Sequence, residues 1–253
     1  MIISKKLKKF KNNKNYFFNK NGGYSTGIYK SLNCGLGSKD KKKNVIKNIN
    51  VVCKKINSLK KNLFLLNQIH SNKFIFIDKN YKFKKKKIKA DAIITNLKKL
   101  PIGVLTADCV PILIYEKELK IIAAIHAGWK GAYKDIIYKV LSFIKRLGSQ
   151  NKNIYVAIGP CITGKNYEVQ KDFKQKFIKK NKKNSSFFKR NKNKTYFCLN
   201  NYIYNQFKEN GIKNIELIKK NTFDKKNNFF SARRSHKNNE HDYGRNISII
   251  MIK

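Results

Sequence analysis

Three residues with metal-binding or nucleophilic side chains each stand near the end of an apolar run. They are His70 in LLNQIHSNK, Cys109 in GVLTADCVPIL and His126 in IIAAIHAGWKGAY. Zinc prefers imidazole and thiolate ligands, and two histidines with one cysteine leave a fourth position for water or substrate. Copper is a second possibility, because the same groups suit it. We therefore expect these residues to converge on one catalytic site that holds a metal.

The spacing of the three residues excludes a compact zinc finger. They lie 39 positions (70 to 109) and 17 positions (109 to 126) apart, so separate strand ends must meet in space. Each residue also has a simpler interpretation, because a histidine can stabilise a turn and a lone cysteine is commonly a small buried hydrophobe. A metal-free Cys–His hydrolase is a further alternative, with Cys109 as nucleophile and His126 or His70 as its base.

Residues beside these three could extend the site. The HAGWKG turn contains Gly128 and Gly131 and leads into a predicted helix, whose first N–H groups, with Lys130, can bind an anion such as phosphate. The glycines could instead serve only the backbone of a tight turn. Asp91 and Asp108 are candidate proton acceptors, or structural hydrogen-bond acceptors at strand ends.

Arginine is rare in this lysine-rich chain. Three of the five arginines (Arg233, Arg234 and Arg245) lie in FFSARRSHKNNEHDYGRNISII. A planar guanidinium fits phosphate or carboxylate in a way that an ammonium group does not, so the segment predicts ligand binding rather than a basic surface strand pair. His236 and His241 lie among polar residues, and we expect them to be exposed.

The elements that must position these residues follow from the hydrophobic pattern. Strands are predicted over 63–69, 73–78, 92–95, 102–106, 111–115, 120–125, 154–158 and 247–252. Helices are predicted over 43–57, 131–146, 170–181 and 200–210, and Lys/Asn-rich surface loops over 80–89, 179–194 and 219–228. The irregular alternation indicates a mixed α/β or α+β class. No Pro/Gly/Ser-rich linker divides the chain, so we expect one domain over 1–253.

The net charge of +44 is large, with 58 Lys and Arg against 14 Asp and Glu. A charge of this size attracts nucleic acid or anionic lipid. The lysines are nevertheless spread along the whole chain among Asn and Ile, as in the product of an AT-rich genome. We therefore favour a solvated surface over a dedicated nucleic-acid face, and expect no specific nucleic-acid or membrane partner. The positive field would still help to gather anionic substrates.

The cysteines and apolar runs bear on location. Five scattered cysteines without a CxxC pair make a disulfide framework improbable and favour a reducing cytoplasm. The longest apolar stretch, Pro101 to Tyr115, is interrupted by Asp108 and Pro111, which excludes a membrane span there. The basic N-terminus has no apolar segment after it, so we expect no secretory signal.

Seven short segments in order carry a resemblance to a known family. They are SLNCG (31–35), LNQIHS (66–71), ADAIIT (90–95), TADCVP (106–111), IHAGWKG (125–131), IGPCI (158–162) and FFSARR…GR (229–245). From about residue 17 to the end, the chain resembles the YfiH/laccase-domain family, once described as multicopper polyphenol oxidases. TADC and HAGW together are highly specific. Residues 1–16 are then expected to form a basic N-terminal extension.

The resemblance implies both a fold and an activity. The fold is a four-layer α/β/β/α sandwich of mixed sheets. The activity is zinc-dependent purine nucleoside phosphorolysis of adenosine, inosine, guanosine and methylthioadenosine, together with adenosine deamination. The small-molecule partners would be nucleosides and phosphate. A copper-dependent polyphenol oxidase is an alternative, although one three-ligand site without His-rich clusters is poorly equipped for multi-copper chemistry.

The resemblance also assigns residues. The metal ligands and catalytic residues would be His70, Cys109 and His126, and the residues lining the substrate and phosphate site would be Asn33, Gln68, Arg233 and Arg245. The chain departs from the family pattern on the substrate side. Asn19-Lys20 replaces Thr-Arg, Ile49 stands in place of an arginine, Asn221 in place of a cysteine and Ala232 in place of a tyrosine. These departures bear on substrate range and rate.

Overall fold

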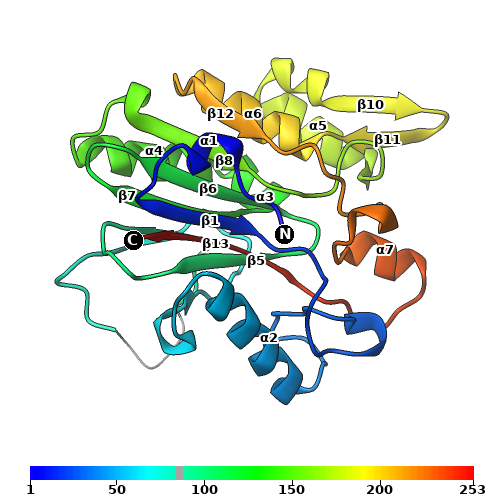
Figure 1. Ribbon diagram of the computed structural model, residues 1–253. Helices are drawn as coiled ribbons and strands as arrows, with labels where there is room; N and C mark the ends of the chain where they lie inside the picture. Colours follow the sequence, from blue (N-terminus) through cyan, green and yellow to red (C-terminus); the bar gives the residue numbers. More distant parts are fainter. Residues whose placement is uncertain (84–87) are drawn as a thin grey trace.

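Two β-sheets packed face to face form the centre of the protein, in a computed structural model that describes residues 1–83 and 88–253 (Figure 1). Within these residues the larger sheet has the order β12-β8-β6-β7-β4-β3 and the smaller one the order β1-β13-β5-β2. The strands of the larger sheet are β3 (Phe74–Ile77), β4 (Ala92–Thr95), β6 (Val110–Glu116), β7 (Ile121–Ala127), β8 (Ile154–Ile158) and β12 (Asn214–Leu217). Those of the smaller sheet are β1 (Asn13–Phe17), β2 (Phe64–Leu65), β5 (Ile102–Thr106) and β13 (Asn246–Ile252).

Three apolar clusters show how the layers stack. One joins helix α2 (Lys42–Lys55) to the outer face of the smaller sheet and includes Ile49, Val52, Ile247 and Ile249. A second fills the space between the sheets and includes Ile102, Leu113, Ile122 and Ile250. A third joins α4 (Ile136–Arg146) and α6 (Leu199–Glu209) to the outer face of the larger sheet and includes Ile112, Ile125, Val140 and Ile203. The α/β/β/α layering and the mixed α/β class are therefore confirmed.

Alternate residues of strand β7 serve different layers. Ile121, Ala123 and Ile125 belong to the cluster beneath the outer helices, whereas Ile122 and Ala124 belong to the cluster between the sheets. Because side chains alternate along a strand, His126 continues the second set. It therefore lies on the inter-sheet face, at the end of the sandwich where the strand terminates.

A smaller aromatic-rich unit covers one end of the larger sheet. It consists of α5 (Lys171–Lys180) and a three-stranded sheet of β9 (Glu168–Val169), β11 (Lys194–Phe197) and β10 (Phe188–Asn191). The rings of Phe173, Phe177, Phe188 and Phe197 have centroids 4.8–6.1 Å apart. The remaining helices are α1 (Lys5–Lys8), α3 (Trp129–Tyr133) and α7 (Ala232–Lys237), with short 3-10 helices at Gly27–Tyr29, Lys60–Asn62, Asn151–Asn153, Lys182–Phe187 and Lys225–Asn227. Nowhere in the described chain is a helix long and apolar enough to cross a membrane.

Two predicted elements differ from the structure. The predicted strand 63–69 is reduced to β2, because the chain leaves the sheet at Leu66 and turns towards Asp91. The predicted helix 131–146 is two helices, α3 and α4, which meet at Asp135. Asp135 has a φ of 62°, a left-handed conformation that interrupts helical hydrogen bonding and that aspartate adopts more readily than most residues.

Two of the three predicted surface loops are partly wrong. Residues 179–194 include the end of α5, a 3-10 helix and strand β10, because Phe187 and Phe188 pack on the aromatic unit. Within 219–228, Asn221 and Thr222 are buried, and the Thr222 hydroxyl donates to Asp108. Of the third predicted loop, 80–89, residues 84–87 lie outside the described residues.

The predicted N-terminal extension, 1–16, is packed into the fold. Strand β1 pairs with β13, and Ile2 forms a bridge with Phe17. Leu7 is fully buried in the cluster between the sheets, and Ser4 donates to Glu216 on β12. The lysines of this segment made it resemble a solvated tail, but the few apolar side chains among them enter the core.

This packing predicts a measurable stability cost. Replacing Leu7 by alanine should lower the free energy of unfolding by about 2–5 kcal/mol, since it removes a fully buried side chain from a well-packed core. Denaturant unfolding monitored by circular dichroism measures this cost. The matched control is Lys8→Ala, an exposed neighbour, which should change stability by about 0.5 kcal/mol or less. Equal stabilities of the two variants would mean that the segment is a loose extension.

Candidate metal centre

His70, Cys109 and His126 meet at one end of the two sheets, as the sequence predicted. His70 lies in the loop after β2, Cys109 between β5 and β6, and His126 near the end of β7. One donor atom from each lies within 4.8 Å of the other two. The Cys109 Sγ atom is 4.0 Å from His70 Nδ1, and the two imidazole centroids are 4.7 Å apart. The three strand ends therefore bring two nitrogens and one sulfur to a common point.

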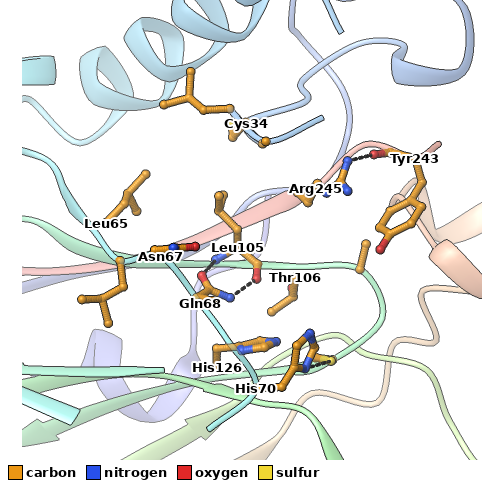
Figure 2. A pocket seen from close by; sticks show the side chains of 16 residues that line it. Cys34, Leu65, Asn67, Gln68, His70, Leu105, Thr106, His126, Tyr243 and Arg245 are labelled. Carbon is orange, nitrogen blue, oxygen red and sulfur yellow. Dashed lines mark hydrogen bonds between the residues drawn. The ribbon is translucent and has the colours of Figure 1, made fainter. Parts of the chain in front are cut away.

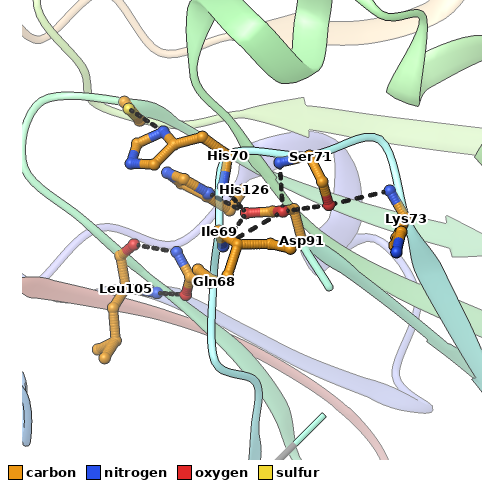
Figure 3. Close-up of polar contacts among 9 residues, drawn as sticks. Gln68, Ile69, His70, Ser71, Lys73, Asp91, Leu105 and His126 are labelled. Carbon is orange, nitrogen blue, oxygen red and sulfur yellow. Dashed lines mark hydrogen bonds and ion pairs between the residues drawn. The ribbon is translucent and has the colours of Figure 1, made fainter. Parts of the chain in front are cut away.

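The buried carboxylate of Asp91 orients both histidines (Figure 3). One oxygen, Oδ1, accepts from His126 Nδ1 at 2.8 Å and from the His70 backbone N–H at 3.0 Å. The other, Oδ2, accepts from the Ser71 backbone N–H and hydroxyl, both at 2.6 Å. Because His126 Nδ1 donates its proton to Asp91, Nε2 is the ring nitrogen left for Cys109 or a metal ion.

The loop that carries His70 has its shape because of this carboxylate. The backbone N–H groups of Ile69, His70 and Ser71 all point at Asp91. Successive N–H groups can converge in this way when one residue is left-handed, and His70 has a φ of 56°. Although burial disfavours its charge, hydrogen bonds from His126 and Ser71 outweigh burial and hold the pKa of Asp91 below its usual value.

The thiol of Cys109 ionises readily beside these histidines. Burial alone would raise its pKa, but the charge and hydrogen bonds of His126 and His70 outweigh burial and lower the pKa to about 6. In return, the Cys109 thiolate and Asp91 raise the pKa of His126 to about 9 against the effect of burial. The pair therefore shares a proton as thiolate and imidazolium. A metal ion that binds here takes the place of this proton.

The space between the donors fits a metal ion. A Cβ atom added at Gly128 would lie 2.7 Å from His70 Nδ1 and 3.0 Å from Cys109 Sγ, so a side chain there would enter the site. Gly128 has an ordinary extended backbone, with φ −75° and ψ 169°. The glycine is thus required for space rather than for a special turn conformation. At Gly131 a Cβ would lie 2.7 Å from the Ser71 carbonyl oxygen, so this glycine lets α3 approach the His70 loop.

The donor set opens onto a pocket of about 510 Å³ (Figure 2). This volume lies in the range of small-molecule sites. Leu36, Leu65, Leu66 and Leu105 supply apolar walls, and Tyr243 and Arg245 lie side by side on the rim. The Arg245 guanidinium carbon is 4.2 Å from the centre of the Tyr243 ring, and its Nη1 donates to Asp242. Sequence reasoning did not single out Tyr243, because an isolated tyrosine carries no motif.

The predicted substrate residues Gln68 and Asn33 have their polar atoms occupied by the protein. Gln68 lines the pocket, but its amide donates to and accepts from the backbone of Leu105. Asn33 is fully buried, and its oxygen accepts from the backbone N–H groups of Gly35 and Arg245. In the structure both side chains hold the pocket walls in place. Contact with substrate remains a prediction for each.

The arginines are divided between two places. Arg245 lines the large pocket, whereas Arg233 lines a second cavity on another side of Cys109. Arg234 instead donates to the carbonyl oxygens of Thr222, Phe223 and Phe229, and so fastens the segment before α7. The residues Ala232–Lys237 form helix α7, not the basic surface strand pair that was the alternative for this segment, and His236 and His241 are exposed as predicted.

Other candidate residues have structural surroundings. Both carboxylate oxygens of Asp108 are engaged, by the Thr222 and Ser231 hydroxyls and the Arg233 backbone N–H. Asp108 therefore connects the Cys109 loop to α7, which favours the structural role over that of proton acceptor. Lys130 is exposed and lies over the Trp129 ring rather than in either cavity beside Cys109.

Three of the departures from the family pattern, at Ile49, Asn221 and Ala232, lie in different surroundings. Ile49 is buried in the apolar cluster under α2. Asn221 is buried, donating to Asn166 and accepting from Thr163. Only Ala232 borders a cavity beside Cys109, the second one. Of these three positions, Ala232 is thus the one that directly shapes space at the centre.

The fold and the site together define an α/β/β/α sandwich protein with a His/Cys/His centre at the end of its two sheets. Among known families, residues 14–253 match the one described as multi-copper polyphenol oxidoreductase laccase. The chain belongs to this family.

Relatives and solved structures agree with this assignment. The purine nucleoside phosphorylase of Rickettsia conorii is 35% identical over 194 residues, which cover 76% of this chain and 78% of the relative. That of Aquifex aeolicus is 39% identical over 164 residues, covering 64% and 72%. The crystal structure of the hypothetical protein YfiH from Bacillus licheniformis superimposes with a TM-score of 0.87 at 26% identity, over 95% of this chain and 93% of that one.

The hydrogen bonds of Asp91 predict that replacing one of its carboxylate oxygens will weaken metal binding. Asp91→Asn keeps the shape of the side chain but replaces one carboxylate oxygen by an NH2 group. That NH2 group would point at an N–H donor, either that of Ser71 or that of His126, so one hydrogen bond is lost. We expect zinc affinity to fall about 10- to 100-fold, because the orientation of both histidines is lost. Competition with a chromophoric chelator measures this affinity.

The control for this variant is Asp172→Asn, which changes an exposed carboxylate on α5 and should leave zinc affinity unchanged. Thermal melting of both variants would show that the Asp91→Asn protein is folded. Unchanged zinc affinity in a folded Asp91→Asn protein would contradict the orienting role of Asp91.

Proposed function

We propose that the protein is a purine nucleoside phosphorylase that uses zinc at His70, Cys109 and His126. Its substrates would be adenosine, inosine, guanosine and methylthioadenosine, with phosphate as the second reactant. The observation that carries this proposal is the His/Cys/His cluster at the wall of a pocket large enough for a nucleoside. The names of the relatives from Rickettsia conorii and Aquifex aeolicus support it.

The pocket has the composition that a nucleoside requires. Leucine side chains from three separate segments form apolar walls suited to the faces of a purine. The Tyr243 ring on the rim offers a surface for stacking, since every purine has a π face. Asn67 and Thr106 place polar groups among these walls, which can bind ribose hydroxyls. Asn33 and Gln68 fix the loops that carry these groups.

Phosphorolysis needs positioning and charge stabilisation more than covalent chemistry. A phosphate oxygen forms a bond to the anomeric carbon of ribose, while the glycosidic C–N bond breaks and its electron pair leaves with the purine, which is then protonated. A bound metal would supply positive charge to polarise an oxygen of the reactants. Asp91 keeps His70 and His126 oriented towards that charge, and Arg233 and Arg245 add positive charge on two sides of Cys109.

Adenosine deamination is the second reaction proposed for the same pocket. Here the oxygen of water replaces the amino group of the purine ring, and ammonia leaves. The two reactions differ in one requirement, because only phosphorolysis consumes phosphate. Product analysis with and without phosphate therefore separates them.

A metal-free hydrolase is the alternative that one observation favours. The lowered pKa of Cys109 beside His126 is what a cysteine nucleophile with its base would show. The same thiolate is also what a metal ligand needs, so metal dependence decides between the two. The family description names copper chemistry. For this reason the metal content of the protein must be measured together with its activity.

The decisive experiment incubates zinc-loaded protein with adenosine and identifies the products. We expect adenine and ribose 1-phosphate only when phosphate is present, and inosine with or without phosphate. Cys109→Ser should lose bound zinc and reduce both activities by roughly 100-fold or more, because losing a ligand should cost at least as much as losing a group that orients one. Cys53→Ser, a buried cysteine on α2, is the matched control and should keep both.

Three outcomes would overturn the proposal. Full activity after metal removal would favour the Cys–His hydrolase. Phenol oxidation that scales with bound copper would favour the oxidase. An absence of free purine, ribose phosphate and inosine would reject a nucleoside as substrate.

A further inference from the structure

The large pocket contains few groups that could protonate a departing purine. When the glycosidic C–N bond breaks, its electron pair leaves with the purine, and a ring nitrogen must take up a proton. An acid positioned for such a step typically accelerates it by about 10²- to 10⁴-fold. Asp91 and Asp108 are hydrogen-bonded within the protein and do not line this pocket, so neither can reach a bound purine.

Most polar residues that line the pocket are unsuited to donate this proton. Arg245 keeps its charge in proteins, and Thr106 is an aliphatic alcohol, a much weaker acid than a phenol. The thiol of Cys34 is fully buried and lies 3.6 Å from the Leu32 carbonyl oxygen. Of the three proposed metal ligands, the cysteine would be a thiolate, and a bound histidine could release its last proton only as an imidazolate, a stronger base than a phenolate. Among the described residues that line the pocket, the acid that remains is Tyr243.

The hydroxyl of Tyr243 is placed to meet a ligand. Figure 2 shows it pointing from the rim towards the pocket, on the side where His70 lies. Within residues 1–83 and 88–253 it makes no hydrogen bond to the protein, whereas the hydroxyl of Tyr29 donates to Asp242 at 2.8 Å. The half-buried phenol of Tyr243 therefore keeps its proton available for a substrate.

The guanidinium of Arg245 covers one face of the Tyr243 ring, 4.2 Å from the ring centre. Three contacts fix it there. Its Nη1 donates to Asp242 and to the Tyr243 carbonyl oxygen, and its side chain packs so closely on Gly35 that a Cβ at Gly35 would lie 2.5 Å from Arg245 Cδ. A cation held over the ring stabilises the negative charge of a phenolate. The other ring face and the hydroxyl remain for the substrate.

We propose that the Tyr243 hydroxyl is the acid that protonates the departing purine, with Arg245 stabilising the phenolate that forms. This role rests on the proposed phosphorylase function. As the C–N bond breaks and a phosphate oxygen bonds to the anomeric carbon, the Tyr243 proton moves to N7 of the purine. The new phosphate ester then releases a proton to water and the phenolate takes one from water, which restores the hydroxyl.

The first test removes only the hydroxyl from zinc-loaded protein. Tyr243→Phe keeps the ring beneath Arg245, so kcat for inosine with phosphate should fall about 100-fold or more while the KM for inosine stays within about 2-fold. Tyr138→Phe, which alters an exposed tyrosine on α4, is the matched control and should change neither constant. If Tyr243 serves only for stacking, Tyr243→Phe will keep the wild-type kcat, and the inference is wrong.

The second test uses a purine that needs no proton. The base of 7-methylguanosine already carries a methyl group on N7 and leaves as a neutral molecule. Tyr243→Phe should therefore cleave 7-methylguanosine at a rate within about 3-fold of wild type, although it cleaves inosine poorly. Equal losses with both nucleosides would mean that the variant has lost orientation rather than an acid, and would overturn the proposal. Zinc content and melting temperature would show that the metal centre and fold persist.

The failure of this inference differs from the failure of the proposed function. Wild-type protein that releases no purine from inosine with phosphate would reject the phosphorylase, and the role of Tyr243 with it. Active wild-type protein together with an equally active Tyr243→Phe variant would keep the phosphorylase and reject Tyr243 as its acid.

Discussion

The hydrogen bonds accepted by the buried carboxylate of Asp91 are the interaction on which the candidate centre depends. Asp91 directly precedes β4, and the pairing of β4 with β7 brings it beside His126. From there it gathers the loop of His70 through three successive backbone N–H groups. One buried charge thus fixes two ligands that are 56 positions apart (70 to 126), and its own burial is offset by the donors it organises.

A second buried carboxylate, that of Asp108, connects segments on the other side of Cys109 through hydrogen bonds. Asp108 connects the β5–β6 connection to Thr222, Ser231 and the start of α7. Because Asp108 is the neighbour of Cys109, the same contacts set the position of the thiolate and of Arg233. Each side of the centre is therefore held by one aspartate whose carboxylate oxygens accept hydrogen bonds from other residues of the protein. These contacts favour a structural role for both aspartates over that of proton acceptor.

Much of the framework could be predicted from the sequence, because buried strands carry dense apolar patterns. The bounds of β4, β5 and β8 follow from apolar runs that end in polar residues. The convergence of His70, Cys109 and His126 was expected from their ligand types and from the family resemblance, because the runs alone do not show which strand ends meet. What could not be predicted depends on contacts distant in sequence. Leu7 packs in the core although lysines surround it in the sequence. The left-handed residue Asp135 divides a segment whose apolar pattern is continuous for a helix. The pairing of Gln68 with Leu105 likewise has no local signature.

The account's central claim is that one sulfur and two imidazole nitrogens hold a single metal ion. X-ray absorption spectroscopy at the zinc edge of the loaded protein tests this most directly. It should show one sulfur at about 2.3 Å and two imidazole nitrogens at about 2.0–2.1 Å, with the remaining scatterer from water or substrate. A zinc ion with only nitrogen and oxygen neighbours, or a spectrum unchanged in Cys109→Ser, would contradict the claim.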